Sequence, residues 1–143
     1  MKKRILHGTL PKASWPYVLS HPVLVTVGVV AVLTGFLIGL WPDLMELSSL
    51  GIWIPGIWER LWPSFHAIGG LALLYGILHR KPHYEAAGCV LLASTFASQC
   101  VAVLAIRGFG AGFLAAATLG SLALGLAIRC YVLAWAASRG RET

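Results

Sequence analysis

Charged residues are scarce in this chain of 143 residues. They make up 11% of the sequence, with only five Asp or Glu residues, whereas an ordinary soluble domain has about 25% charged residues. Hydrophobic residues make up 58%. A soluble domain of this length leaves much of its surface in water and cannot hide so much apolar surface. The composition therefore excludes a cytosolic globular enzyme, a disordered chain and a nucleic-acid-binding domain.

The residue patterns of catalytic and metal sites are also missing. The sequence has no P-loop, GxGxxG, GxSxG or HExxH motif. Its three cysteines, Cys89, Cys100 and Cys130, lie within apolar stretches and form no CxxC or Cys/His cluster. We therefore expect these cysteines to act as small packing residues. We therefore expect a protein that is not an enzyme and that has no catalytic residues, no metal site, no cofactor and no small-molecule substrate.

Long apolar stretches, by contrast, occur four times. A transmembrane helix needs about 20 mostly apolar residues. The stretches that meet this requirement are 18–40, 57–78, 84–106 and 111–136. They predict an all-α fold in which one integral membrane four-helix bundle accounts for residues 1–143 as a single domain, with the lipid bilayer as its surroundings.

Basic residues gather on one side of the predicted spans. Arg60 and Arg107 are the two on the opposite side. Cytoplasmic flanks of membrane proteins carry an excess of Lys and Arg, so we expect a multi-pass protein of the inner (plasma) membrane with both termini in the cytoplasm. The residues on the basic side are Lys2, Lys3, Arg4, Lys12, Arg80, Lys81, Arg139 and Arg141.

The loop between the first two spans, residues 41–56, is apolar rather than polar. Asp43 and Glu46 have the spacing of a capping box, and Leu44, Leu47 and Leu50 recur at roughly helical intervals. One interpretation is a short interfacial helix in the outer headgroup region. The other is an apolar loop that packs on the ends of the spans.

Small residues recur at four-residue intervals within the spans, a pattern that lets helix backbones approach closely in lipid. This pattern has two interpretations, which are compatible: packing within one bundle, and association of several copies into a homo-oligomer. The residues that we expect in helix association are Gly35, Gly39, Ala116, Gly120, Ser121 and Gly125.

Four polar residues within the spans are candidate functional residues, because it is costly to place polar groups inside the membrane. His66 and Gln99 lie at nearly equal depths below the outer surface, so a hydrogen bond between them is plausible. Glu85 and Arg129 lie near the inner ends of their spans, where a long Arg side chain can reach a partner. His66 is interpreted as a satisfied packing residue or, alternatively, as part of the polar lining of a water path. Glu85 and Arg129 are interpreted as a structural ion pair or, alternatively, as charges that face a pore or gate it.

Three sequence features of the region 57–139 resemble small four-span membrane proteins of actinobacterial phages, some of them regarded as holins or holin-associated proteins. An aromatic entry, Trp58–Trp62, leads into a Gly-rich segment at 68–72. Glu85–Gly88 places small residues after an acidic residue, and Arg129–Trp135 gives an Arg-plus-aromatic exit. The resemblance implies a holin-like protein that oligomerises and forms pores in the inner membrane for phage lysis, and it brings no catalytic residues.

Two other functions remain open from the sequence. The chain is also interpreted as a structural or accessory subunit with protein partners in a larger membrane complex, since its material is almost entirely helix surface. A small transporter or channel is the third hypothesis. It is weakened because the first span has no carboxylate of the kind that a compact proton-coupled exporter would need.

Overall fold

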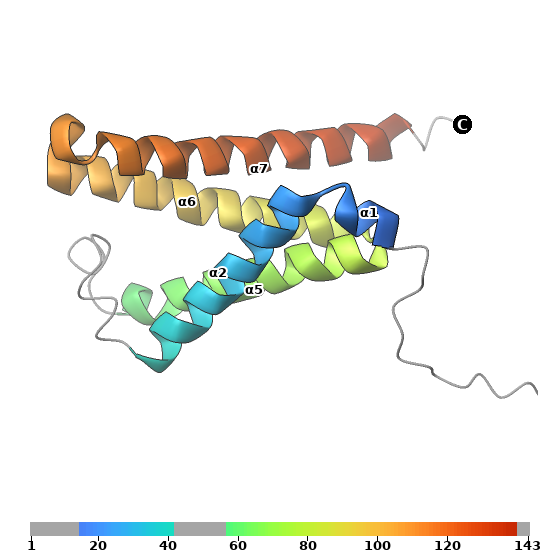
Figure 1. The fold of residues 1–143 in the computed structure, drawn as a ribbon, viewed down its shortest axis with the longest axis horizontal. Helices are drawn as coiled ribbons and strands as arrows, with labels where there is room; N and C mark the ends of the chain where they lie inside the picture. Colours follow the sequence, from blue (N-terminus) through green and yellow to red (C-terminus); the bar gives the residue numbers. More distant parts are fainter. Residues whose placement is uncertain (1–14, 42–56, 140–143) are drawn as a thin grey trace, which may run out of the picture.

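A computed structural model describes residues 15–41 and 57–139 of the chain. The regular structure in this described part consists of five helices (Figure 1), so the predicted all-α fold is confirmed. The predicted interfacial helix falls in the segment 42–56, which lies outside the described residues. The helices are α1 (Trp15–Leu19), α2 (Pro22–Leu40), α5 (Ile57–His79), α6 (Pro82–Ala111) and α7 (Phe113–Arg139).

Four of these helices are long and apolar enough to cross a membrane, as the sequence predicts. The shortest, α2, has 19 residues, and the longest, α6, has 30. At a rise of 1.5 Å per residue α2 is about 28 Å long, compared with about 30 Å for the hydrocarbon core of a bilayer, and α6 is interrupted by a kink at Gly108. The chain is accordingly a multi-pass membrane protein with four candidate spanning helices.

The first span begins later than the sequence predicts. We expected a helix from residue 18 onward, whereas α1 ends at Leu19 and α2 begins at Pro22. Between them, His21 has φ −126° and ψ 49°, outside the helical region. The cause is Pro22, whose ring disfavours the helical conformation of the residue before it. This break separates α1 from the spanning helix α2.

The turn between α5 and α6 is tight. Arg80 adopts a left-handed conformation with φ 52°, and the Lys81 N–H donates a 2.8 Å hydrogen bond to the Gly76 carbonyl oxygen. This bond back over five residues is typical of a Schellman helix end. Pro82 then begins α6, where its missing N–H costs nothing. The chain therefore reverses direction within a few residues.

Glycines make the turn between α6 and α7, in the region where the sequence predicts it. Gly108 has a positive φ of 68° and interrupts the helical conformation near the end of α6. Such a φ is readily adopted by glycine and by few other residues. The Gly112 N–H then donates a 3.2 Å hydrogen bond to the Gly108 carbonyl oxygen, and α7 begins at Phe113.

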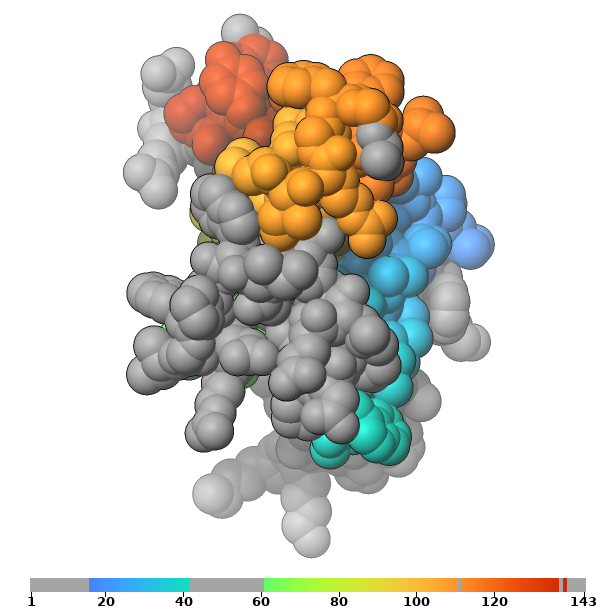
Figure 2. Space-filling model, turned by 90° about the vertical axis from the view of Figure 1, so that its left-hand side faces the viewer, coloured from blue at the N-terminus to red at the C-terminus, as the bar shows by residue number. Residues whose placement is uncertain are grey.

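The long helices pack mainly on their neighbours in the sequence, with α5 and α6 in the middle of the bundle (Figure 1). The turn between α5 and α6 lies at the same end as α1 and the C-terminal end of α7. Figure 2 looks at the opposite end, where the start of α7 and the end of α2 are visible. The core that joins the four helices consists of Ala31, Leu73, Ile77, Cys89, Leu92, Phe96, Ala123 and Leu126.

Glycine sets the distance between α2 and α5. A Cβ atom on Gly35 would lie 2.5 Å from the Pro63 carbonyl oxygen, and one on Gly70 would lie 2.7 Å from the Gly28 carbonyl oxygen. Backbones this close gain dispersion contacts that larger side chains would prevent. Gly35, the first glycine of the GxxxG pattern, is therefore used in packing within one chain.

Candidate functional site

A buried ion pair joins α6 to α7 near the end of the bundle that carries the α5–α6 turn. Arg129 Nη2 lies 2.7 Å from Glu85 Oε1, and Arg129 Nε donates a 2.7 Å hydrogen bond to the same oxygen. The Glu85 side chain is 1% exposed and that of Arg129 is 22% exposed. The structure thus brings together two of the four polar residues that the sequence analysis singled out.

Tyr17 of α1 completes this cluster. Its hydroxyl donates a 3.1 Å hydrogen bond to Glu85 Oε2 and accepts a 2.7 Å hydrogen bond from Arg129 Nη2. The guanidinium carbon of Arg80 lies 5.8 Å from the centroid of the Tyr17 ring, a distance typical of a cation–π contact. We call Tyr17, Glu85 and Arg129 the ion-pair cluster. It connects three elements that are far apart in the sequence.

Tyr17 lies outside the four spanning segments, and its surroundings favour the neutral hydroxyl. Burial raises the pKa of Tyr17 above its ordinary value of 10.0, and the negative charge of Glu85 raises it further. The positive charge of Arg129 lowers this pKa, but it does not outweigh the other two effects. The hydroxyl therefore remains protonated, so that it can donate to the carboxylate.

Local sequence explains how Glu85 reaches its place. It lies in the first turn of α6, where the helix dipole favours a negative charge. On the facing helix, Gly76 has no side chain, and a Cβ atom there would collide with the Glu85 backbone. The approach of α5 and α6 at this point therefore depends on glycine. Because the carboxylate is paired with Arg129, the cluster stabilises the bundle and presents no free base.

The other predicted polar pair is not joined. His66 is 3% exposed, and its ring lies 5.6 Å from that of Trp62 and 5.7 Å from that of Phe96. It makes a hydrogen bond with the Trp62 backbone. Gln99 is half-buried, and among the described hydrogen bonds none connects it to His66. His66 is therefore a packed and satisfied side chain. Its neighbour Trp62, by contrast, has a buried Nε1 atom without a hydrogen-bond partner.

The small residues expected in helix association divide into two groups. Besides Gly35, Ala116 is buried at 3% exposure, and a Cβ atom on Gly120 would lie 3.5 Å from Cys100 Sγ of α6. Gly39 and Gly125 face open space, because a Cβ atom on either would have no neighbour within 4 Å. Ser121 is also exposed, and its hydroxyl donates a 2.7 Å hydrogen bond to the Ala117 carbonyl oxygen.

Sequence reasoning missed Tyr17 and the glycines at the helix contacts. Tyr17 precedes the first predicted span, and it contacts Glu85 from α1, on the other side of the break at His21 from α2. Gly76 and Gly88 permit the close approach of α5 and α6, since a Cβ atom on Gly88 would collide with the Leu73 backbone. The signal for them was present, because Gly69, Gly70 and Gly76 concentrate in one span.

Two further observations bear on what this chain is. Within residues 15–41 and 57–139, no three His, Cys, Asp or Glu side chains are placed to hold a metal ion. No protein-family model matches the chain, and neither curated proteins nor solved structures give a match. The assignment therefore rests on the fold: this is a multi-pass membrane protein whose helices form an apolar bundle with a buried ion pair at one end.

Proposed function

We propose that the protein permeabilises the plasma membrane as a homo-oligomer, in the manner of a holin. The observation that carries this proposal is the unpartnered outer face of α7. In the 18-residue apolar stretch that marks α7 as a membrane span, 11% of the residues are buried, whereas 44% are buried in the corresponding stretch of α5. A helix that its own chain leaves so open is available to a second copy.

The outer face of α7 has the residues for close helix contact. Ala117, Ser121 and Gly125 follow one another at four-residue intervals and are all exposed. Leu114 and Ile128 lie on the same face and are 79% and 55% exposed. Small residues in this spacing let two backbones approach, and larger ones at the ends fill the groove beside them. We call these five residues the α7 stripe.

A pore of this protein would form between copies. The space between the four helices of one chain is filled by the apolar core, from Ala31 of α2 to Leu126 of α7. Glu85 and Arg129 form an ion pair at one end of the bundle and neutralise each other. They therefore do not line a water path through a single chain. In an oligomer, the gap enclosed by several bundles supplies the opening through which ions and an endolysin would pass.

The proposed orientation places both chain termini in the cytoplasm. Arg80 and Lys81 lie in the α5–α6 turn, at the same end of the bundle as α1 and the end of α7 (Figure 1). The exposed Arg107 lies near the opposite end. The excess of basic residues at the α5–α6 end supports a cytoplasmic position for that end.

The test uses two substitutions on α7 that introduce the same side chain, leucine. Gly125→Leu adds bulk within the α7 stripe, where a Cβ atom meets no neighbour in the chain, so the monomer should still fold. Ala127→Leu adds bulk at an exposed position outside the stripe and is the matched control. We expect wild type and Ala127→Leu to form oligomers in vesicles and to release an entrapped dye. Gly125→Leu should remain monomeric and retain the dye; equal oligomers and equal release for all three would contradict the proposal.

A role as an accessory subunit is the second candidate, favoured by the same open stripe. Exposed Ser121 and Gly125 would accept a helix of another membrane protein as readily as a second copy. This role predicts intact vesicles and a co-purified partner that Gly125→Leu releases and Ala127→Leu retains. Dye release by the purified protein alone would exclude it.

A further inference from the structure

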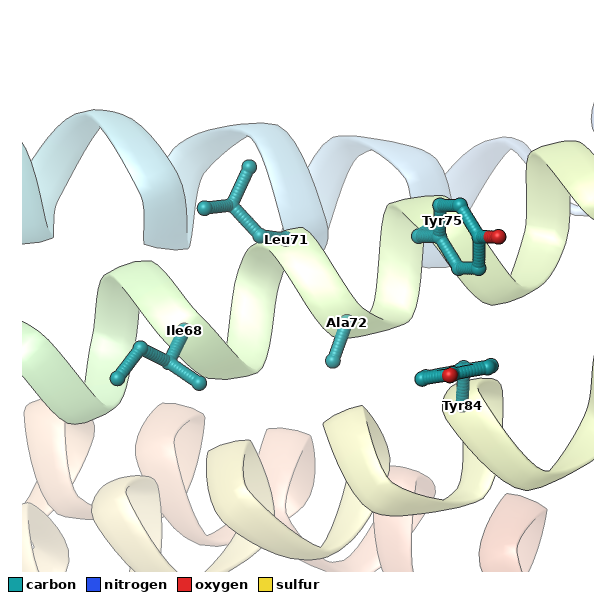
Figure 3. A pocket seen from close by; sticks show the side chains of 5 residues that line it. All are labelled: Ile68, Leu71, Ala72, Tyr75 and Tyr84. Atoms are coloured by element: carbon teal, nitrogen blue, oxygen red, sulfur yellow. The ribbon is translucent and has the colours of Figure 1, made fainter.

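An apolar groove runs along the outer side of α5 and ends at the first turn of α6. It has a volume of about 470 Å³ and is lined by the five residues labelled in Figure 3: Ile68, Leu71, Ala72, Tyr75 and Tyr84. Ile68 and Leu71 are 55% and 50% exposed. The floor of the groove is thus purely aliphatic, and its two tyrosines lie at the end nearer the α5–α6 turn.

Aromatic rings close that end of the groove. The rings of Tyr75 and Tyr84 meet edge to face with centroids 5.0 Å apart. Tyr75 also stacks on His79 at 4.3 Å, and His83 lies 4.8 Å from Tyr84. Tyrosine is enriched at the level of the lipid headgroups, where its ring is in apolar surroundings and its hydroxyl is in water. The rings therefore place the boundary between acyl chains and headgroups at this point.

Positive charge lies directly beyond the rings. Arg80 and Lys81 form the turn between α5 and α6, and both side chains are exposed. Arg80 also contacts the ring of Tyr17, which holds it at this end of the bundle. The neighbouring carboxylate, that of Glu85, is buried and is neutralised by Arg129. Lys81 therefore supplies an exposed positive charge just outside the aromatic rings.

We propose that this groove binds one acyl chain of an anionic phospholipid whose phosphate contacts Lys81. The lining residues of α5, from Ile68 to Tyr75, extend over about 10 Å at 1.5 Å per residue. The groove therefore covers about two thirds of one leaflet, which is half of the roughly 30 Å hydrocarbon core. Basic residues beside membrane helices bind anionic headgroups, and the aliphatic floor fits the chain. The proposal does not depend on pore formation.

The experiment measures lipid retention by native mass spectrometry. The purified protein is released from bilayers that contain equal amounts of phosphatidylglycerol and phosphatidylcholine. We expect wild type to retain one phosphatidylglycerol about fivefold more often than phosphatidylcholine, the preference of one basic contact. Lys81→Gln should abolish this preference. The control Arg107→Gln, which removes an exposed basic residue near the other end of the bundle, should keep it.

A second pair of variants tests the groove itself. Ala72→Phe fills the groove and should reduce retention of both lipids, while Ala127→Phe adds the same ring to an exposed site on α7 and should not. Equal retention of the two lipids by wild type would overturn the proposal, as would a preference that survives Lys81→Gln. Retention unchanged in a folded Ala72→Phe would overturn the placement in the groove. Because Lys81 is exposed in a turn, Lys81→Gln should fold normally. The lipid preference of Lys81→Gln therefore tests the proposal even if Ala72→Phe fails to fold.

Discussion

Glu85 and Arg129 illustrate, at the scale of single residues, how an apolar bundle accommodates charge. Removing an ion from water costs several kcal/mol, and a pair offsets this cost only with good geometry and further hydrogen bonds. Here one carboxylate oxygen accepts a hydrogen bond from Arg129 Nε and lies 2.7 Å from Nη2, and the other accepts a hydrogen bond from Tyr17. Both carboxylate oxygens therefore have a partner, and removal of one charged residue leaves the other without its counter-ion.

Replacing Glu85 by glutamine should destabilise the bundle. Glu85→Gln leaves the Arg129 charge without its partner, and breaking a buried pair in this way costs about 3 kcal/mol. The measurement is the free energy of unfolding from a titration with denaturing detergent, followed by circular dichroism. The double variant Glu85→Gln/Arg129→Gln removes both charges and should recover part of the loss; losses that simply add would contradict the coupling.

The hydroxyl of Tyr17 should make stability depend on alkaline pH. Burial and the charge of Glu85 raise the pKa of Tyr17 above 10.0, the value of an unfolded chain. The stabilisation is thus complete below pH 10 and is lost as pH rises through the higher folded-state pKa, because the unfolded chain ionises first. The ultraviolet difference titration of wild type against Tyr17→Phe should show one tyrosine that ionises above pH 10. A component that titrates at or below pH 10 would contradict the cluster.

The depth of a single residue within its span could be predicted from the sequence. The side of the helix on which that residue lies could not. Counting along each span places Glu85 and Arg129 at one end, and the structure brings them together. The same count places His66 and Gln99 at one level, yet His66 faces Trp62 and Phe96. The spans are apolar all round, so no amphipathic period marks the face that packs inward. Direction is therefore decided by packing.

Glycine has opposite roles in different helices at the scale of secondary-structure elements. Gly76 and Gly88 lie where α5 and α6 touch, and a Cβ atom on either would collide with the facing backbone. Gly39 and Gly125 lie at open positions on α2 and α7. Gly39, Gly76 and Gly125 share one sequence pattern, because each follows a small residue at a four-residue interval. What separates them is whether another helix is present, and this is a property of the folded chain.

Alanine substitutions at two glycines should therefore have opposite effects on stability. Gly76→Ala forces the backbones of α5 and α6 apart and should cost at least about 2 kcal/mol by overpacking. Gly125→Ala adds a methyl group in open space and should stabilise α7 by up to about 1 kcal/mol through helix propensity. Unfolding free energies in the same detergent compare the two variants. A loss at Gly125 as large as that at Gly76 would refute this distinction.

Element boundaries followed the sequence only where a residue had a clear backbone effect. Pro82 begins α6, and Gly108 interrupts it before the turn into α7, in line with the predicted turns. The break before α2 was not predicted, because the apolar stretch 18–40 continues through Pro22 without a change in composition. Its effect on His21 separates α1 from α2, and α1 then supplies Tyr17 to the ion-pair cluster.

At the scale of the whole molecule, four spans bring both described ends of the chain to one side. The start of α1 and the end of α7 lie at the same end of the bundle (Figure 1), and Arg80 and Lys81 occupy the turn beside them. The fold class and the number of spans could be predicted because apolar length alone decides them. The proposed association between copies concerns surfaces that a single chain leaves open.

The orientation of the bundle should follow its basic end. A fluorescent protein that folds only in the cytoplasm should fluoresce when it is fused after α7, and a phosphatase that is active only outside should remain inactive there. This result is expected because Arg80 and Lys81 lie at that end and cytoplasmic flanks favour basic residues. The reverse pattern of the two reporters would show the opposite orientation.

The membrane potential of growing bacteria tests the central claim most directly. Wild type and Ala127→Leu are expressed from an inducible promoter and followed with a potential-sensitive dye. We predict an abrupt collapse of the potential at a reproducible time, with lysis only when an endolysin is also expressed. Gly125→Leu, at equal membrane levels, should leave the potential intact. A stable potential and normal growth with abundant wild-type protein in the membrane would contradict the permeabilising function.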